Sequence, residues 1–144
     1  MKVDLEGKVA SITGAAGGIG SEMARMFARN GAIVVVSDLN EEDGMKVVEE
    51  IRGEGGTASF VRTDVAEMPD DVAMAETVIA EYGKIDILIN NAGINIGMKD
   101  RGPIHVFPDE MWKKIINVDL DGVYFCSKAV LKYMVEKGSG KIIN

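Results

Sequence analysis

Residues that commonly build metal centres, disulfides and nucleic-acid surfaces are scarce in this 144-residue sequence. The single cysteine, Cys126, excludes an internal disulfide and suits a reducing compartment. The single histidine, His105, is best interpreted as a loop side chain, because no cluster of His, Cys and carboxylates has metal-ligand spacing. With 16 Lys and Arg against 23 Asp and Glu, the net charge of −7 argues against nucleic-acid binding. We therefore expect neither a metal nor a nucleic acid as partner.

Long apolar runs are absent as well. No stretch approaches the roughly 20 residues that a membrane-spanning helix needs, and Met1-Lys2 leads directly into acidic residues instead of a signal-peptide core. The sequence thus favours a cytoplasmic protein that does not enter a membrane. Its length is that of one domain and is sufficient for a hydrophobic core.

Short apolar runs alternate with segments of helical periodicity along the whole chain. Strands are predicted at residues 9–12, 33–36, 58–61, 85–89 and 141–144, and helices begin near residues 19, 41, 69 and 108. This alternation predicts a parallel sheet covered on both faces. With right-handed crossovers, we expect an α/β fold of the Rossmann type over residues 1–144. Its doubly wound parallel sheet would have the strand order 3-2-1-4-5 in three α/β/α layers.

The segment Val9–Gly20 combines an apolar run, a cluster of glycines and the start of an amphipathic helix. A strand, a tight turn and a helix N-terminus in that order form an anion site, because the free N–H groups of the first helical turn face an incoming phosphate. Gly14 can adopt backbone angles forbidden to other residues. Gly17, Gly18 and Gly20 would let a pyrophosphate approach the backbone and the helix approach the strand. Glycine-rich turns also occur for packing alone, so the segment needs support from elsewhere.

That support comes from the second apolar run, Ile33–Val36, which is followed by Asp38. Asp38 lies 18 residues after Gly20, near the spacing of the acidic residue that binds an adenosine ribose. A carboxylate there accepts from both ribose hydroxyls and repels a 2′-phosphate, and neither Ala15 nor Ala16 supplies a compensating positive charge. Asp38 therefore predicts NAD in preference to NADP. The alternative interpretation is an ordinary turn residue before the next helix.

Polar residues follow the predicted strands at one edge of the sheet. Thr13, Gly14, Asp38, Asp64 and Asn90 all stand at carboxyl ends of strands. Ligands of doubly wound sheets bind in the crevice outside these ends, where the strand order reverses. We therefore expect the site between the first and fourth strands.

Four motifs in this order resemble the short-chain dehydrogenase/reductase family, in its short, non-extended branch. They are TGAAGGIG at Thr13–Gly20, Asp64-Val65, NNAG at Asn90–Gly93, and Asn117. The resemblance implies that the cofactor contacts Gly14, Ala16, Gly17, Gly18, Ile19, Gly20, Asp38, Leu39, Asp64, Val65, Asn91, Ala92 and Gly93. It implies that Asp64 and Val65 contact the adenine, that Asn91–Gly93 follow the cofactor ribose, and that Asn117 holds a water in the catalytic proton relay.

The resemblance also implies hydride transfer between a nicotinamide and an alcohol or ketone, with a Ser and a Tyr-x-x-x-Lys pair after the fifth strand. The sequence ends at Asn144, inside that strand. The upstream match, Tyr124 with Lys128, lies on the helix of Asn117 and before the fifth strand, so we do not assign it to catalysis. We therefore expect an incomplete NAD(P)-binding domain that is truncated in the fifth strand. The parent enzyme is expected to be active, and the fragment itself is expected to be inactive.

Three functions are compatible with these observations. The first is an NAD-dependent alcohol dehydrogenase or ketone reductase acting on a small molecule. The second is a non-catalytic dinucleotide-binding fragment or sensor, and the third is a 3-oxoacyl-carrier reductase. The loop Ile94–Phe107, with Met98, Lys99, Asp100, Arg101 and His105, is expected to border the substrate pocket. The family resemblance further implies a homo-oligomer, either a dimer or a tetramer, assembled through the long helix.

Overall fold

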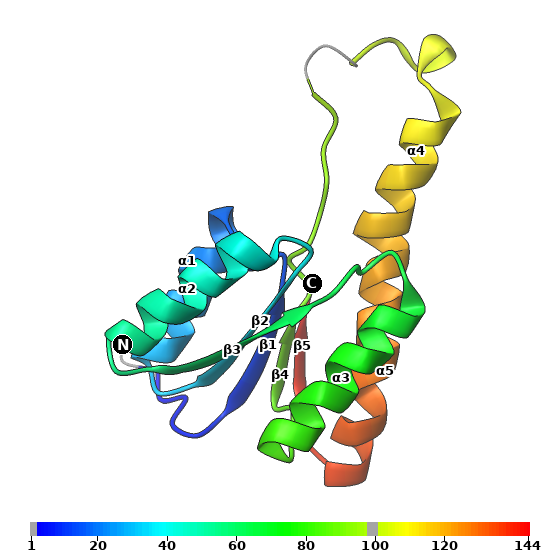
Figure 1. The fold of residues 1–144 in the computed structure, drawn as a ribbon. Helices are drawn as coiled ribbons and strands as arrows, with labels where there is room; N and C mark the ends of the chain where they lie inside the picture. Colours follow the sequence, from blue (N-terminus) through cyan, green and yellow to red (C-terminus); the bar gives the residue numbers. More distant parts are fainter. Residues whose placement is uncertain (1–2, 98–100) are drawn as a thin grey trace.

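The chain folds around a five-stranded parallel sheet, seen in the computed structural model that describes residues 3–97 and 101–144 (Figure 1). The strands are β1 (Val9–Thr13), β2 (Ile33–Asp38), β3 (Thr57–Arg62), β4 (Ile87–Ile89) and β5 (Lys141–Ile143). Their order is β3-β2-β1-β4-β5, which confirms the Rossmann-type topology expected from the sequence. β1 lies at the centre, where Ala10 pairs with Val34 of β2 and with Ile87 of β4.

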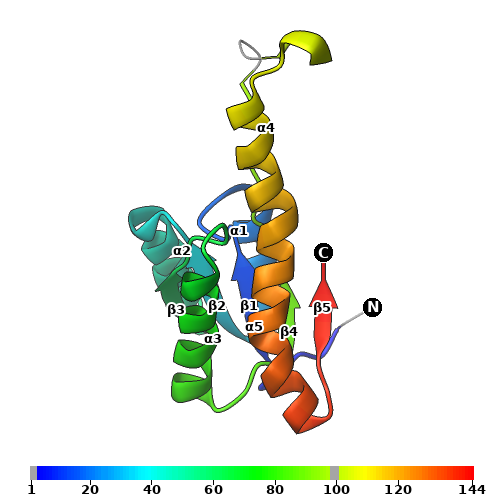
Figure 2. The same ribbon diagram turned by 90° about the vertical axis from the view of Figure 1, so that its right-hand side faces the viewer.

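Helices cover both faces of the sheet, as Figures 1 and 2 show. The helices α1 (Gly18–Arg29) and α2 (Glu41–Gly53) cover one face, and α3 (Met68–Tyr82) and α5 (Gly122–Lys137) cover the other. Because successive side chains of a strand point to opposite faces, adjacent valines of β2 belong to different cores. Val34 packs with α1 and α2, whereas Val35 packs with α3 and α5. The two apolar clusters hold the three layers together and leave the strand ends free to carry polar residues.

The long helix expected after residue 108 is one rod made of three parts. These are α4 (Asp109–Ile116), a π-helical segment η3 (Asn117–Asp121), and α5. Figure 2 shows α4 extending past the carboxyl edge of the sheet. Gly138 ends the rod in the left-handed conformation that favours glycine. Among the residues that the structure describes, no helix has the length and apolar character needed to cross a bilayer.

The observed strands differ from the predicted ranges by one or two residues at their ends, and two differences change the course of the chain at β4 and after it. The fourth strand begins at Ile87 rather than at Ile85, because the carboxylate of Asp86 accepts a hydrogen bond from the N–H of Val9 at 2.9 Å. A side chain thus occupies the position where a backbone carbonyl would extend the ladder. The second difference is a short 3₁₀ helix, η2 (Ile104–Val106), within the segment predicted to be an irregular loop.

Candidate functional site

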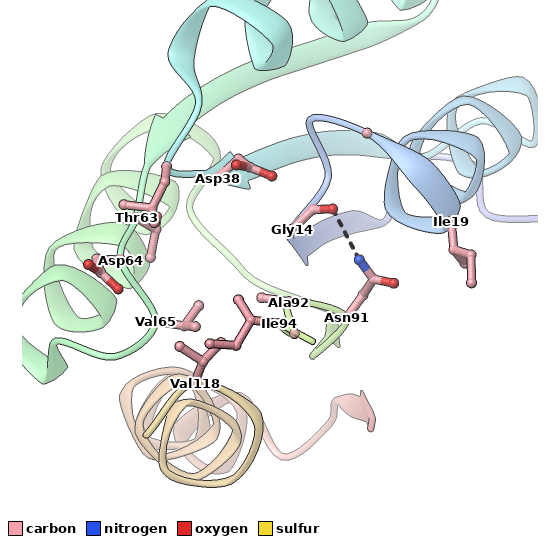
Figure 3. A pocket seen from close by; sticks show the side chains of 13 residues that line it. Gly14, Ile19, Asp38, Thr63, Asp64, Val65, Asn91, Ala92, Ile94 and Val118 are labelled. Carbon is pink, nitrogen blue, oxygen red and sulfur yellow. Dashed lines mark hydrogen bonds between the residues drawn. The ribbon is translucent and has the colours of Figure 1, made fainter. Parts of the chain in front are cut away.

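A cavity of about 470 Å³ opens at the carboxyl edge of the sheet, between the ends of β1, β2, β3 and β4 (Figure 3). Its volume lies within the range of small-molecule and cofactor sites. It is lined by Gly14, Gly17, Ile19, Asp38, Leu39, Thr63, Asp64, Val65, Asn91, Ala92, Gly93, Ile94 and Val118. Ten of these thirteen are predicted cofactor-binding residues, so the fold brings most of that set together.

The glycines of the β1–α1 turn divide into two kinds. Gly14 has φ +63°, and a Cβ placed on it would lie 2.8 Å from the Cα of Ala92. A Cβ on Gly20 would overlap the carbonyl oxygen of Gly14. By contrast, a Cβ on Gly17 or Gly18 would meet no atom of the described chain within 4 Å. Two glycines are therefore required for packing, and two leave open space at the start of α1.

The N-terminus of α1 faces this open space without a side-chain cap. Gly17 is the N-cap residue in extended conformation, and no side chain of the described residues accepts from the first turn of the helix. The first turn also contains no acidic residue. Its backbone N–H groups and the positive end of the helix dipole are therefore available to an anion.

Asp38 lies at the end of β2 with its carboxylate held by the backbone. Oδ2 accepts from the N–H of Ala16 at 2.9 Å, and Oδ1 accepts from the N–H of Asn40 at 3.0 Å. A carboxylate has about four lone-pair positions, so roughly half remain for a ligand. The predicted residue Ala16 thus does not line the cavity but fixes the orientation of Asp38. Leu39 follows at the cavity wall and is exposed.

The ends of β1 and β4 are joined by the Thr13 hydroxyl. Thr13 Oγ1 accepts from the N–H groups of Asn91 and Ala92, both at 3.1 Å, and donates to the carbonyl of Ile89 at 3.3 Å. The Asn91 side chain donates back to the carbonyls of Thr13 at 2.9 Å and Gly14 at 3.1 Å (Figure 3). The wall formed by Asn91–Gly93 is therefore held to Thr13 and Gly14 by four hydrogen bonds.

The opposite wall begins where β3 ends. The carboxylate of Asp64 accepts from the N–H of Ala66 at 3.0 Å, which stabilises the turn that places Val65 in the cavity. Val65 is nearly buried. A Cβ on Gly122 would lie 2.9 Å from the carbonyl oxygen of Val65, so this glycine lets the rod approach the turn closely. Figure 3 shows Val65, Ile94 and Val118 pointing into the cavity from three different segments.

The π segment places neighbouring residues on different sides of the rod. Val118 lines the cavity, and Asp119 Oδ1 accepts from the N–H of Ile94 at 2.8 Å. Asn117 does not line this cavity. It lines a separate surface hollow together with Trp112, Lys113, Lys114, Ile116 and Asp121. The structure therefore does not join Asn117 to the other predicted site residues, and its catalytic role stays a prediction.

Three cavity residues were not predicted to contact the cofactor: Thr63, Val118 and Ile94, the last of which begins the loop expected to border the substrate pocket. Thr63 precedes Asp64, Ile94 follows the NNAG segment, and Val118 follows Asn117. This adjacency to predicted residues is the sequence feature from which they could have been predicted. Gly18 and Gly20, although predicted, do not line the cavity. Of the loop residues expected near a substrate, Arg101 and His105 are exposed and do not line it either, and Met98, Lys99 and Asp100 lie outside the described residues.

The upstream tyrosine and lysine form a local pair away from the cavity. Lys128 Nζ donates to Tyr124 Oη at 3.3 Å, and the Tyr124 side chain remains exposed on α5. Neither residue lines the cavity. Over residues 3–97 and 101–144, no three His, Cys, Asp or Glu side chains gather in a way that could bind a metal ion.

One titratable pair lies in the core, between α3 and α5. The Cys126 thiol donates to Asp71 Oδ1 at 2.8 Å, and Asp71 Oδ2 is buried without a partner. Burial raises the pKa of Asp71 to about 7, and burial together with this hydrogen bond raises the pKa of Cys126. Cys126 is 1% exposed, so its side chain is part of the core between α3 and α5.

Comparison with known proteins identifies the family. Residues 8–144 match the family model of the short chain dehydrogenases, and the chain belongs to that family. It is 40% identical over 140 residues to an uncharacterised oxidoreductase of Thermotoga maritima, covering 97% of this chain and 53% of that protein. It is 36% identical over 144 residues to a 3-oxoacyl-acyl-carrier-protein reductase of Chlamydia pneumoniae, covering 100% and 56% respectively. The chain thus spans about half the length of the curated relatives it matches.

Solved structures share the fold closely. A gluconate 5-dehydrogenase from Burkholderia cenocepacia, in complex with NADP and tartrate, superposes with a TM-score of 0.90 at 40% identity, covering 99% of this chain and 55% of that one. An NAD⁺-bound xylitol dehydrogenase superposes with a TM-score of 0.91 at 28% identity, covering 97% and 53%. Both nicotinamide dinucleotides therefore occur among the structural relatives. The chain is an oxidoreductase-family protein with a nucleotide-binding Rossmann fold.

Proposed function

We propose that the protein is an NAD(H)-dependent oxidoreductase that transfers hydride between the nicotinamide and a small alcohol or ketone. The observation that carries the choice of cofactor is Asp38 at the cavity wall, with two backbone hydrogen bonds and free lone pairs. A ribose diol can donate to such a carboxylate, whereas a 2′-phosphate would meet a like charge. The NADP complex among the relatives makes this choice worth testing directly.

The described residues fit a dinucleotide. The uncapped N-terminus of α1 and the open space at Gly17 and Gly18 suit a pyrophosphate. Asp38 and Leu39 suit the adenosine ribose, and Asp64 and Val65 suit the adenine. Gly14, Ile19 and Asn91–Gly93 are proposed to hold the nicotinamide side, with Gly20 supporting the turn through its close contact with Gly14. When bound, the nicotinamide supplies the hydride chemistry.

The chain's own residues then orient the cofactor and limit the access of water. The hydrogen bonds from Thr13 and Asn91 hold one wall rigid, and the apolar side chains of Val65, Ile94 and Val118 make part of the cavity dry. Asn117 is proposed to position a water for proton transfer, at a point beyond the cavity described above. The acid–base role is proposed for a Tyr-x-x-x-Lys pair that follows the fifth strand, and not for Tyr124 and Lys128, which lie before that strand and do not line the cavity.

Two other functions are compatible with the same cavity. A 3-oxoacyl-carrier reductase is supported by the identity to the Chlamydia pneumoniae enzyme, and Asp38 is the residue that weighs against the NADP such enzymes usually prefer. A non-catalytic dinucleotide-binding module would have the same cavity without turnover. Both alternatives differ from the main proposal in measurable ways.

The proposal extends to the oligomeric state and the location of the protein. Leu131 and Val135 are exposed on α5, and a second subunit would bury them. These exposed apolar side chains therefore support a homo-oligomer, either a dimer or a tetramer. The single buried cysteine supports a cytoplasmic location.

The test compares NADH with NADPH binding by nucleotide fluorescence in the purified protein. We expect NADH to bind at least about tenfold more tightly, and Asp38→Asn to reduce that ratio by removing the charge. Glu42→Gln is the matched control, because it removes the same charge from an exposed position of α2 outside the cavity. Equal or tighter binding of NADPH by the unsubstituted protein would overturn the choice of cofactor.

The enzymatic half of the proposal is tested in the full-length enzyme, because residues 1–144 alone are expected to be inactive, by NADH oxidation with a panel of small ketones and aldehydes. Turnover of such compounds supports the main proposal. NADH binding without turnover of any carbonyl compound, including 3-oxoacyl thioesters, supports the non-catalytic module. Turnover restricted to 3-oxoacyl thioesters supports the carrier reductase.

A further inference from the structure

We propose that Asp71 of α3 and Cys126 of α5 form a pH-sensitive contact, which opens when Asp71 loses its proton and thereby weakens NADH binding. The inference rests on the proposed function, because it concerns the cavity wall at Asp64 and Val65, which is proposed to hold the adenine. Neither Asp71 nor Cys126 lines the cavity. Their effect is on the packing behind this wall and does not involve contact with the cofactor.

Asp71 is an acid enclosed without a compensating positive charge. Its side chain is fully buried, the thiol of Cys126 donates to Oδ1 at 2.8 Å, and Oδ2 has no hydrogen-bond partner among the described residues. Within residues 3–97 and 101–144, no Lys or Arg forms an ion pair with it. An ionised carboxylate is strongly disfavoured in such surroundings, because a buried charge must be paired and hydrogen-bonded. The observed packing therefore suits the protonated acid.

The groups around Asp71 place its ionisation near neutral pH. Burial is the main cause that raises the pKa of Asp71 to about 7, against the opposing effect of the hydrogen bond from Cys126. The like charges of Asp70 on α3 and Asp64 on the β3–α3 turn raise this pKa further. From α5, Cys126 remains a neutral thiol, because burial raises its own pKa. The strands contribute apolar side chains to the core around Cys126, namely Val9, Val35 and Leu88.

On the side of α5, the contact lies one helical turn from the cavity wall. Gly122 precedes Cys126 by four residues, and a Cβ on Gly122 would lie 2.9 Å from the carbonyl oxygen of Val65. Val65 and Cys126 also belong to the same apolar cluster. The position of α5 at Cys126 is therefore coupled to the position of Val65.

On the side of α3, backbone hydrogen bonds connect the contact to the same wall. The N–H of Asp71 donates to the carbonyl of Glu67 at 3.4 Å, and the N–H of Glu67 donates to the carbonyl of Asp64 at 3.0 Å. Figures 1 and 2 show α3 and α5 side by side on one face of the sheet. A separation of the two helices at Asp71 and Cys126 would therefore move both supports of the adenine wall.

The direction of the pH effect follows from the charge of Asp71. Below about pH 7 the acid keeps its proton, the helices stay packed and the wall is in place. Above this pH the carboxylate needs water at Oδ2, which the packing excludes, so α3 separates from α5. Because NADH binds the form with the wall in place, its affinity should fall as pH rises through about 7. A single linked proton changes the affinity by at most about tenfold per pH unit.

The experiment compares the unsubstituted protein with three variants at about pH 6 and about pH 8. Asp71→Asn and Asp71→Leu carry no charge at either pH. Glu76→Gln is the matched control, because Glu76 is an exposed carboxylate of α3 whose partner on α5 is Lys132 at 3.9 Å. Two quantities are measured: the dissociation constant for NADH, and the rate at which iodoacetamide alkylates Cys126. The alkylation rate is read from the Cys126 peptide by mass spectrometry and divided by the rate for free cysteine in the same buffer, which corrects for the reactivity of the thiol itself.

We expect the dissociation constant of the unsubstituted protein to be about fivefold higher at the higher pH, and the relative alkylation rate to rise by a similar factor. Glu76→Gln should behave in the same way. In Asp71→Asn and Asp71→Leu, both quantities should change less than about twofold. The inference is overturned if either folded Asp71 variant keeps the full pH dependence, or if Cys126 is equally protected at both pH values. A protein that binds no NADH at either pH refutes the proposed function, and the alkylation rates still show whether the contact opens.

Discussion

The hydroxyl of Thr13 offers a direct test of how the site is held together. Replacement by valine keeps the β-branched shape but removes three hydrogen bonds, two accepted from the N–H groups of Asn91 and Ala92 and one donated to Ile89. Thr13 is 1% exposed, so water cannot take the place of the hydroxyl. Each unpaired backbone donor costs about 1–3 kcal/mol when buried. Both donors border the cavity and are only partly buried, so the lower part of that range applies to each.

We therefore expect Thr13→Val to lower the free energy of unfolding by about 2–4 kcal/mol, a large part of the 5–15 kcal/mol typical of a domain. Thr13→Ser, which keeps the hydroxyl, should lose about 1 kcal/mol or less. Urea unfolding followed by circular dichroism measures both, with an unchanged slope against urea showing that the same surface unfolds. If valine and serine destabilise the protein equally, the two amides are satisfied without Thr13, and the reasoning is refuted.

Two further predictions concern a glycine and a buried acid. Gly20→Ala should destabilise the protein by about 1–3 kcal/mol, because its Cβ would overlap the Gly14 carbonyl, whereas Gly17→Ala should leave thermal stability nearly unchanged and weaken NADH binding. Similar melting temperatures for the two variants would contradict this. Burial raises the folded-state pKa of Asp71 from 3.8 to about 7. The folded protein therefore holds this proton more tightly than the unfolded chain, and it should lose stability as pH rises from about 4 to about 7. At about 1.36 kcal/mol per pKa unit, the loss in the free energy of unfolding is roughly 4 kcal/mol in total. Asp71→Asn should remove this slope, and parallel curves of melting temperature against pH for the two proteins would refute it.

The architecture was predictable because its signals are local. Each strand is a short apolar run, each helix has its own periodicity, and the handedness of crossovers then restricts the strand order. The residues at strand ends, such as Asp38 and Asp64, were predictable for the same reason. A parallel sheet necessarily gathers them at one edge, so their proximity follows from topology without any knowledge of side-chain contacts.

The remaining features depend on contacts between distant segments. The π segment has no sequence signature, and its effect on Val118 and Asp119 becomes visible only when the rod packs on the β3–α3 turn through Gly122. The start of β4 could not be placed because Asp86 binds the Val9 amide from 77 residues away. The hydrogen bond from the Ala16 amide to Asp38 depends on backbone direction, which the sequence does not show, and the cofactor contact of Ala16 stays a prediction.

The link between β1 and β4 at Thr13 has a consequence for the order of folding events. Thr13 and Asn91 are 78 residues apart, and the cavity wall exists only when both strand ends are in place. Contacts of such sequence separation form slowly, because loop closure must come before they stabilise anything. An intermediate containing only β1, α1 and β2 would carry the glycine turn and Asp38 but lack the opposite wall. Nucleotide binding would therefore follow the completion of the sheet, and the rate at which NADH fluorescence develops during refolding would report on the docking of β4 against β1.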